Sequence, residues 1–165
     1  MMIMCGEFYS LDTPIGEVLI EALDETPAQV ILPGSGIKAG RSVEQAPESV
    51  RVMAEILLAF FEGKEPDPAF TCRLLDGVEV SDFGRRVLEK VAEIPRGSTS
   101  SYGDIAAMAG NPGAARAVGG VMSSNPFPLI IPCHRVIRSD GGIGGFGGGE
   151  EIKSWLLTFE TRGRA

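Results

Sequence analysis

The first third of the chain alternates between apolar and polar positions, the period-two pattern of strands that bury one face. Residues 7–11 and 17–22 show this pattern, and the Thr-Pro-Ile-Gly segment at 13–16 between them has the composition of a hairpin turn. Residues 28–32 form a third apolar run, which ends at a Pro-Gly pair. We therefore expect three strands, the first two joined in a hairpin.

Helical spacing replaces this alternation over residues 47–62. The apolar side chains there recur every three or four positions, at Val50, Ala54, Leu57, Leu58 and Phe61. Pro47 suits the first turn of a helix, and Gly63 suits its end. Residues 64–70 are charged and rich in proline, so we interpret them as a connector.

Three further helices are expected between residues 81 and 122. Ser81 can cap a helix whose apolar positions are Phe83, Val87, Leu88 and Val91, and the Pro-Arg-Gly segment at 95–97 ends it. Short helices are expected over 102–108 and 113–122, separated by a Gly-Asn-Pro break. Two short helices joined in this way indicate either a helix-turn-helix or an ordinary packed pair of helices.

The last helix is expected over residues 150–159, with one apolar face made of Ile152, Trp155, Leu156 and Phe159. It follows a loop with seven glycines between 141 and 149, which permits close backbone approach to a ligand. Together these elements predict an α+β fold in two parts. Residues 1–75 would form an α/β domain of antiparallel strands plus a helix, and residues 76–165 a mostly helical domain with a helix-turn-helix.

Composition is that of an ordinary folded protein, with 165 residues of which 44% are hydrophobic. No apolar run approaches the roughly 20 residues of a membrane helix, and the start lacks a signal-peptide pattern. We therefore expect a cytoplasmic protein with no membrane partner. The cysteines Cys5, Cys72 and Cys133 are widely spaced, and His134 is the only histidine. Neither a disulfide framework nor a metal site is expected.

The net charge of −7 would disfavour nucleic acid if it were evenly spread. Residues 1–80 hold five Lys/Arg and fourteen Asp/Glu, whereas residues 81–165 hold ten Lys/Arg and eight Asp/Glu. The acidic excess therefore lies in the first half, and the second half could contact a phosphate backbone. The same asymmetry also serves solubility, and charge alone favours that simpler interpretation.

Cys133 and His134 carry the clearest chemistry in the sequence. A cysteine attacks as a thiolate, and a free thiol with a pKa of about 8.5 is mostly protonated at neutral pH. An adjacent base can take the proton, and His134 is the sole imidazole of the chain. Neighbouring side chains seldom point the same way, so we expect the proton to pass through a water. An isolated Cys-His pair is more often structural than catalytic. The motif formed by the residues around the pair therefore decides between these two interpretations.

That motif resembles the active-site signature of the O6-alkylguanine-DNA alkyltransferases. It is the Ile-Ile-Pro-Cys-His-Arg-Val-Ile segment at 130–137. Further matches follow the family's order: Ser-Tyr-Gly-Asp-Ile-Ala at 101–106, Gly-Asn-Pro at 110–112, Ala-Ala-Arg-Ala-Val-Gly at 114–119, Asn-Pro at 125–126 and Trp-Leu-Leu at 155–157. The resemblance covers roughly residues 82–160. The first 75 residues match only in general architecture, which in this family is ribonuclease-H-like.

The resemblance implies a repair reaction that each molecule performs once. Cys133 would take an alkyl group from O6 of guanine in double-stranded DNA and keep it, because a thioether has no ready route of hydrolysis. His134 would act as its base through a water, and Glu160 would orient His134. Asn125 would lie at the bend before the active-site segment. No cofactor is implied, and we expect a monomer.

The resemblance also implies how the DNA is held. The O6 atom lies inside the duplex, so the nucleotide has to be rotated out; Tyr102 would assist the rotation and Arg116 would enter the vacated space. The helix over 114–123 would lie in the minor groove. The other DNA-contacting residues would be Ala115, Gly119, Ser123 and Arg135. The alkylguanine pocket would include Val136, Phe146, Gly147 and Gly148.

Two positions depart from the family pattern. Phe146 stands where tyrosine is common, and Ser123 stands where a basic residue is frequent on the recognition helix. Several relatives bind zinc in their amino-terminal part, but a single histidine argues against that here. Two alternatives stay open. A non-catalytic alkyltransferase-like protein would bind lesions, although those relatives replace the cysteine that this chain keeps, and a cysteine hydrolase would need an oxyanion hole and repeated turnover.

Overall fold

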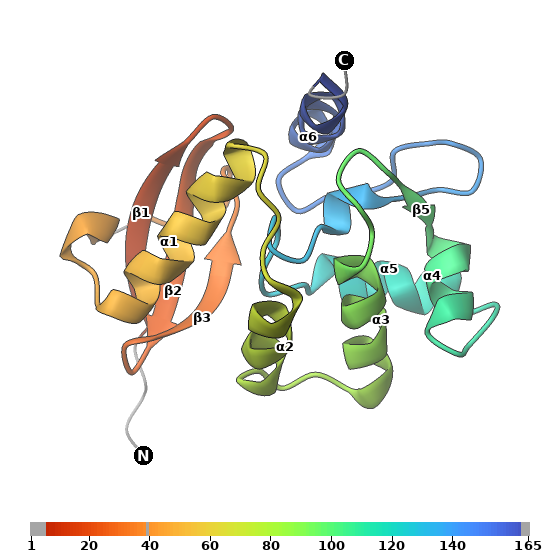
Figure 1. Ribbon diagram of the computed structural model, residues 1–165, viewed down its shortest axis with the longest axis horizontal. Coiled ribbons are helices and arrows are strands. Elements are labelled where there is room, and N and C mark those ends of the chain that lie inside the picture. Colours follow the sequence, from red (N-terminus) through yellow and green to blue (C-terminus); the bar gives the residue numbers. More distant parts are fainter. Residues whose placement is uncertain (1–5, 39, 163–165) are drawn as a thin grey trace. The chain divides into compact units, whose positions relative to one another are not determined.

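The computed structural model describes residues 6–38 and 40–162 (Figure 1). Cys5, for which the sequence gives no function, lies outside the described residues. The chain divides into two compact units between Lys64 and Glu65. This division comes earlier than the expected boundary at 75/76, because the segment before residue 76 folds as a helix that packs within the second unit.

The first unit is a four-stranded sheet with one long helix. Its strands are β1 (Glu7–Thr13), β2 (Gly16–Leu23), β3 (Thr26–Ile31) and β4 (Arg41–Ser42). The first three pair antiparallel in the order β3-β2-β1, and β4 adds to β1 in parallel. The expected hairpin is present, and Gly16 at its end has a φ of 110°, which glycine adopts without strain.

Helix α1 (Glu48–Phe61) follows a short 3-10 turn, η1 (Val43–Gln45), and packs across β1, β2 and β3 (Figure 1). Its buried side chains are Val50, Met53, Ala54, Leu57 and Phe60. The predicted helix is therefore confirmed, but the buried face is turned slightly from the predicted one. Leu58 is 40% exposed, and Met53 and Phe60 are buried in its place.

The second unit is mostly helical. Its helices are α2 (Pro68–Asp76), α3 (Asp82–Ala92), α4 (Tyr102–Met108), α5 (Ala115–Ser123) and α6 (Glu150–Arg162). A 3-10 turn, η2 (Cys133–Arg135), leads into β6 (Val136–Ile137), which pairs in parallel with β5 (Ser100–Ser101). Residues 64–70 were predicted to be a connector, but helix α2 begins within them, at Pro68. Pro68 occupies its first turn, and the carboxylate of Asp67 accepts the N–H of Ala69 at 2.9 Å.

Helices α4 and α5 form the expected pair, packed on each other and on α3. The first of them starts at a capping box, in which Ser101 Oγ accepts the N–H of Asp104 at 3.0 Å and the carboxylate of Asp104 accepts the N–H of Ser101 at 3.3 Å. Gly110 and Gly113, with φ of 83° and 88°, make the turn between the helices. The box fixes Tyr102 as the first residue of α4.

Helix α6 buries a different face from the predicted apolar one. Its buried side chains are Lys153, Leu156 and Glu160. Trp155 is 39% exposed and stacks on Phe159, with ring centroids 4.9 Å apart. Of the predicted face, only Leu156 is fully buried. The pattern did not reveal that Lys153 and Glu160 have buried hydrogen-bond partners in the second unit, which turn their side of the helix inward.

No helix among the described residues is long and apolar enough to cross a bilayer. Within the same residues, no three His, Cys, Asp or Glu side chains are gathered as metal ligands would be. Cys133, His134 and Glu160 all belong to the second unit.

Candidate active site

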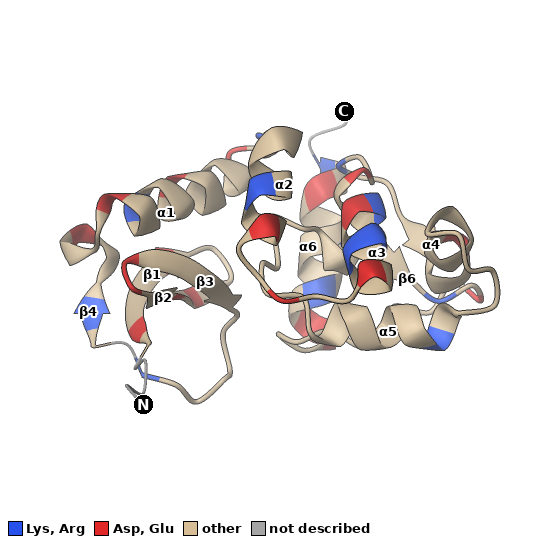
Figure 2. Ribbon diagram, turned by 90° about the horizontal axis from the view of Figure 1, so that it is seen from below, with Lys and Arg blue, Asp and Glu red and all other residues tan. Residues whose placement is uncertain are grey.

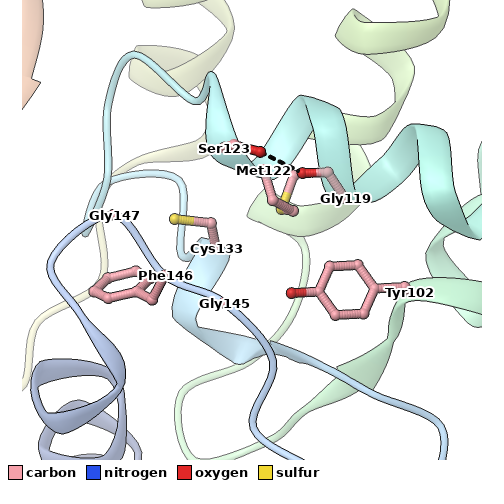
Figure 3. A pocket seen from close by; sticks show the side chains of 8 residues that line it. All are labelled: Tyr102, Gly119, Met122, Ser123, Cys133, Gly145, Phe146 and Gly147. Carbon is pink, nitrogen blue, oxygen red and sulfur yellow. Dashed lines mark hydrogen bonds between the residues drawn. The ribbon is translucent and has the colours of Figure 1, made fainter.

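The side chain of Cys133 points into a cavity of about 340 Å³ on the second unit (Figure 3). Eight residues line the cavity: Tyr102, Gly119, Met122, Ser123, Cys133, Gly145, Phe146 and Gly147. They come from α4, α5, η2 and the glycine-rich loop before α6. Three other segments of the second unit therefore surround the turn that carries the sulfur atom.

Cys133 opens the 3-10 turn η2 and is only 6% exposed. Its backbone N–H donates to the carbonyl of Ile131 at 2.7 Å, which holds the turn against the preceding apolar run. Its sulfur lies among the other side chains that line the cavity (Figure 3). A ligand that enters the cavity can therefore reach the sulfur.

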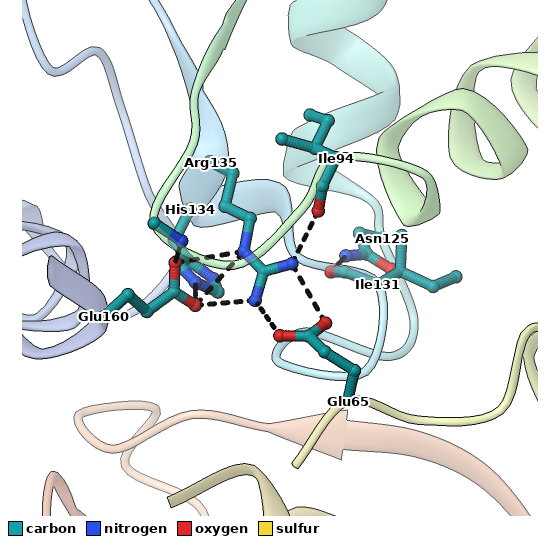
Figure 4. A network of polar contacts seen from close by, with 8 residues as sticks. Glu65, Ile94, Asn125, Ile131, His134, Arg135 and Glu160 are labelled. Atoms are coloured by element: carbon teal, nitrogen blue, oxygen red, sulfur yellow. Dashed lines mark hydrogen bonds and ion pairs between the residues drawn. The ribbon is translucent and has the colours of Figure 1, made fainter. Parts of the chain in front are cut away.

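His134, the residue after Cys133, is fully buried and is bonded to the buried carboxylate of Glu160 (Figure 4). Its Nε2 lies 2.7 Å from Glu160 Oε1, the distance of a charge-assisted hydrogen bond. With Nε2 protonated as the donor, the neutral ring carries its lone pair on Nδ1. The edge of Phe146 packs near the imidazole, with ring centroids 6.4 Å apart. Glu160 and its partners thus fix both the orientation and the tautomer of the ring.

Burial and hydrogen bonds together set the protonation states of Cys133, His134 and Glu160. Burial raises the pKa of the Cys133 thiol, although the Asn125 amide and the charge of Lys153 oppose the rise. Burial also lowers the pKa of His134, against the pull of Glu160. Burial alone would raise the pKa of Glu160, but hydrogen bonds from His134 and Arg135 bring it down to about 2. At neutral pH the site therefore holds a neutral thiol, a neutral imidazole and a carboxylate.

Asn125 holds the bend between α5 and the active-site segment. Its side-chain Nδ2 donates to the carbonyl of Ile131 at 2.9 Å, and its Oδ1 accepts the N–H of Phe127 at 3.0 Å. Leu129, within this bend, has a φ of 74°, which is uncommon for a residue other than glycine. The two bonds from one amide close the loop that leads from α5 back to Cys133.

Lys153 is a buried charge that the sequence analysis missed. Its Nζ donates to the carbonyl of Val136 at 2.7 Å and to that of Gly145 at 3.3 Å. It also lies 5.8 Å from the ring centroid of Tyr102. Burial lowers its pKa, whereas the charge of Cys133 would raise it. The available signal was a lysine spaced three and seven positions before Leu156 and Glu160 on one helix face.

Tyr102 and Arg116 lie together beside a second cavity, next to the first. It is lined by Tyr102, Gly103, Ala115, Arg116, Gly119, Arg138, Ser139 and Asp140. Helix α5 supplies the wall shared by the two cavities through Gly119 and carries no acidic residue (Figure 2). The structure thus brings Ala115, Arg116, Gly119 and Ser123 to one face with Tyr102.

Three residues expected at the site lie elsewhere. Arg135 was expected to contact DNA, but it is fully buried and bonded to two carboxylates, so it cannot reach a DNA backbone. Val136 is fully buried and is not one of the residues that line the cavity. Gly148 lies beyond the lining residues of the glycine loop.

Met122 and Gly145 are lining residues that the sequence analysis did not name. Met122 comes three residues after Gly119 on α5, so helical spacing from a named residue could have identified it. No comparable signal separates Gly145 from the other glycines of its loop.

Known proteins are similar to this chain in sequence and in fold. Residues 82–162 match the family described as 6-O-methylguanine DNA methyltransferase, DNA binding domain. The chain is 43% identical over 125 residues to the methylated-DNA–protein-cysteine methyltransferase of Methanothermobacter thermautotrophicus, a match that covers 76% of this chain and 69% of that protein. It is 36% identical over 162 residues to the human protein of that name, covering 92% of this chain and 78% of the human one.

The fold is also similar to that of a solved structure, the crystal structure of Mycobacterium tuberculosis OGT in complex with DNA. The TM-score is 0.75 at 32% sequence identity, and the match covers 94% of this chain and 93% of the other. The similarity therefore extends well beyond the segment around Cys133, across both units.

Proposed function

The chain belongs to the methylated-DNA–protein-cysteine methyltransferase family, and from this we propose that Cys133 is the cysteine that accepts the alkyl group. The activity is direct-reversal DNA repair, in which the protein itself is alkylated, and DNA is the partner. The observation that supports Cys133 most strongly is its sulfur, which faces an open cavity while His134 and Glu160 stand buried behind it.

The substrate we propose is O6-alkylguanine in duplex DNA, bound through the minor groove by one copy of the chain. Helix α5 supports this, because Ala115, Arg116 and Gly119 make up its side toward the second cavity, and its two small residues let the helix approach a narrow groove closely. Tyr102 lies between the two cavities and Arg116 lies in the second. In this arrangement Tyr102 crowds the nucleotide as it rotates out, and Arg116 fills the space it leaves.

Chemistry begins with the proton of Cys133, because the resting thiol is neutral. His134 accepts this proton through a water, and Glu160 stabilises the imidazolium that results. The charge of Lys153 favours the thiolate. Sulfur then forms a bond to the alkyl carbon as the bond from that carbon to O6 breaks. The guanine leaves with the electron pair and gains one proton, which balances the one lost by the thiol.

The cavity suits a flat base with a small apolar group. Phe146 and Met122 provide apolar walls beside the sulfur, and glycines at 145 and 147 leave room for the base plane (Figure 3). Phe146 brings no hydroxyl to the pocket, so contacts to the alkyl group there are apolar. The non-catalytic lesion-binding alternative is not favoured, because the chain retains Cys133 inside this cavity.

Mass spectrometry after incubation with O6-benzylguanine as the free base tests the assignment. We expect one benzyl group per molecule, on the peptide that contains Cys133. Cys133→Ala should remain unmodified, and the exposed Cys72 should carry no label in either protein. A benzyl group on Cys72, or on Cys133→Ala, would show that another residue is the acceptor.

A further inference from the structure

Arg135 is held between the carboxylates of Glu160 and Glu65 (Figure 4). Only Glu160 takes part in the proposed proton transfer from Cys133 to His134. Its Nε and Nη2 donate to Glu160 at 2.8–3.1 Å. On the other side, Nη1 and Nη2 donate to the two oxygens of Glu65 at 3.1 and 2.8 Å. The remaining N–H of Nη1 donates to the carbonyl of Ile94 at 2.6 Å. All five N–H groups of the guanidinium are engaged.

The contact with Glu65 differs from an ordinary surface ion pair. The side chain of Arg135 is 1% exposed, and that of Glu65 is 43% exposed, so the carboxylate closes the outer side of a buried cation. The pairing is bidentate, which fixes the plane of the guanidinium. Exposed pairs contribute little because water solvates both partners. Here one partner cannot be solvated, so removal of Glu65 leaves part of a buried charge uncompensated.

The charges around His134 explain why this compensation bears on the reaction. Glu160 and Lys153 face the imidazole from α6, Arg135 faces it from η2, and Cys133 adjoins it. Both cations lower the pKa of His134, and Glu160 raises it. Without Glu65, two fixed cations would stand against one carboxylate. With Glu65 the cluster holds two of each, so a proton on His134 adds to a balanced group.

We propose that Glu65 is a positioning residue for alkyl transfer. It holds the outer edge of Arg135 and balances its charge, so that Glu160 stays bonded to His134 and the imidazole stays basic enough to take the proton of Cys133. The inference rests on the proposed function for the reaction itself. Glu65 lies outside the 82–162 segment that matches the family, in the stretch before α2.

The rate constant of alkyl transfer, measured against pH, tests the proposal. Glu65→Gln keeps the shape and removes the charge, and Glu65→Asp keeps the charge. Glu62→Gln is the matched control, since Glu62 is an exposed acid that forms an ion pair with the exposed Lys64. We expect Glu65→Gln to lower the rate at neutral pH by roughly threefold to tenfold. The acid limb of its profile, which is the decrease of the rate as His134 becomes protonated, should move to lower pH. The reason is that a weaker base takes up its proton at a lower pH.

Glu65→Asp should keep the parental acid limb and lose less than about threefold in rate, and Glu62→Gln should match the parent. A purely structural role predicts something else, namely fewer active molecules with an unchanged acid limb. That result, or equal behaviour of Glu65→Gln and Glu62→Gln, would overturn the proposal. If Glu65→Gln does not fold, Glu65→Asp tests the proposal in its place. A shifted acid limb in Glu65→Asp, which keeps the charge, would overturn the proposal.

NMR titration supplies a readout that needs no DNA and no alkyl transfer. His134 is the only histidine of the chain, so its ring signals are assigned without ambiguity. The pKa of His134 should fall by about half a unit in Glu65→Gln relative to the parent and should not change in Glu62→Gln. An unchanged pKa in folded Glu65→Gln would overturn the proposal. A parent that transfers no alkyl group would instead refute the proposed function and leave this titration valid.

Discussion

Burial and hydrogen bonding together decide the charge of each group around Cys133, and at this scale the sequence was only partly informative. The motif indicated Cys133 and His134, the family resemblance implied Glu160, and the structure brings His134 and Glu160 within 2.7 Å. It did not indicate that Arg135 and Lys153 would be buried. A long basic side chain is usually exposed, and only the positions of Glu160, Glu65 and the backbone carbonyls show where these two find partners.

The same protonation states predict how acid affects stability. The pKa of His134 in the folded protein lies below its ordinary 6.5. The contribution of neutral His134 to the free energy of unfolding is therefore complete above pH 6.5 and is lost as the pH falls. The folded pKa of Glu160 is about 2 against an ordinary 4.5, so its contribution, about 3 kcal/mol, is lost as pH falls from 4.5 toward 2. Both effects therefore have the same sign.

Chemical unfolding at a series of pH values measures this effect. The free energy of unfolding should begin to fall below about pH 6.5 and should fall again below about pH 4.5. In His134→Gln the first decrease should be absent, because glutamine does not titrate. A free energy of unfolding that stays constant from neutral pH to pH 4 would contradict the buried arrangement of these groups.

At the scale of elements, strongly periodic segments were predicted well. Strands β1, β2 and β3 of the first unit, helices α1, α3 and α4, and the start of α6 lie where the hydrophobic pattern placed them. Helix α2 was hidden because its amino-terminal turn is proline-rich and charged, which also describes a connector. The glycine loop could be recognised as a close-approach segment, but its contact with Tyr102 depends on tertiary folding.

That contact predicts the effect of a single methyl group. A Cβ at Gly144 would stand 2.9 Å from the hydroxyl oxygen of Tyr102, and the residue has a φ of 75°. Gly144→Ala should therefore displace Tyr102 and slow repair of duplex DNA by about tenfold or more, on the scale of a misplaced site residue. Gly141→Ala is the matched control, because Gly141 has a φ of 83° with open space around it.

The two variants separate backbone strain from the clash. Both should lose a similar amount of stability from the positive φ, on the order of 1 kcal/mol, measured by thermal unfolding. Only Gly144→Ala should repair slowly. Equal repair rates in the two variants would show that the loop does not position Tyr102.

At the scale of the whole molecule, a net charge of −7 coexists with a DNA partner because the acidic residues concentrate in the first half of the sequence. Arg116 on α5 is exposed beside the second cavity. Arg116→Ala should slow repair of duplex DNA by about tenfold to a hundredfold, since rotating a nucleotide out costs a few kcal/mol that Arg116 partly offsets. Its reaction with free O6-benzylguanine should match that of the parent, because no rotation is needed.

Arg73→Ala serves as the control for that prediction, since it removes the same charge from the exposed surface of α2. Rates with duplex and with free base, measured side by side, give the comparison. A parallel loss with both substrates in Arg116→Ala would place Arg116 in the chemical step or in folding rather than in DNA handling.

Incubation with duplex DNA that holds one radiolabelled O6-methylguanine tests the central claim most directly. The label should pass to the peptide containing Cys133, should stop at one methyl group per protein molecule, and should leave unmodified guanine in the DNA. Cys133→Ser should take up none. Label that remains in the DNA, appears on another peptide, or is released over repeated turnovers would contradict the account.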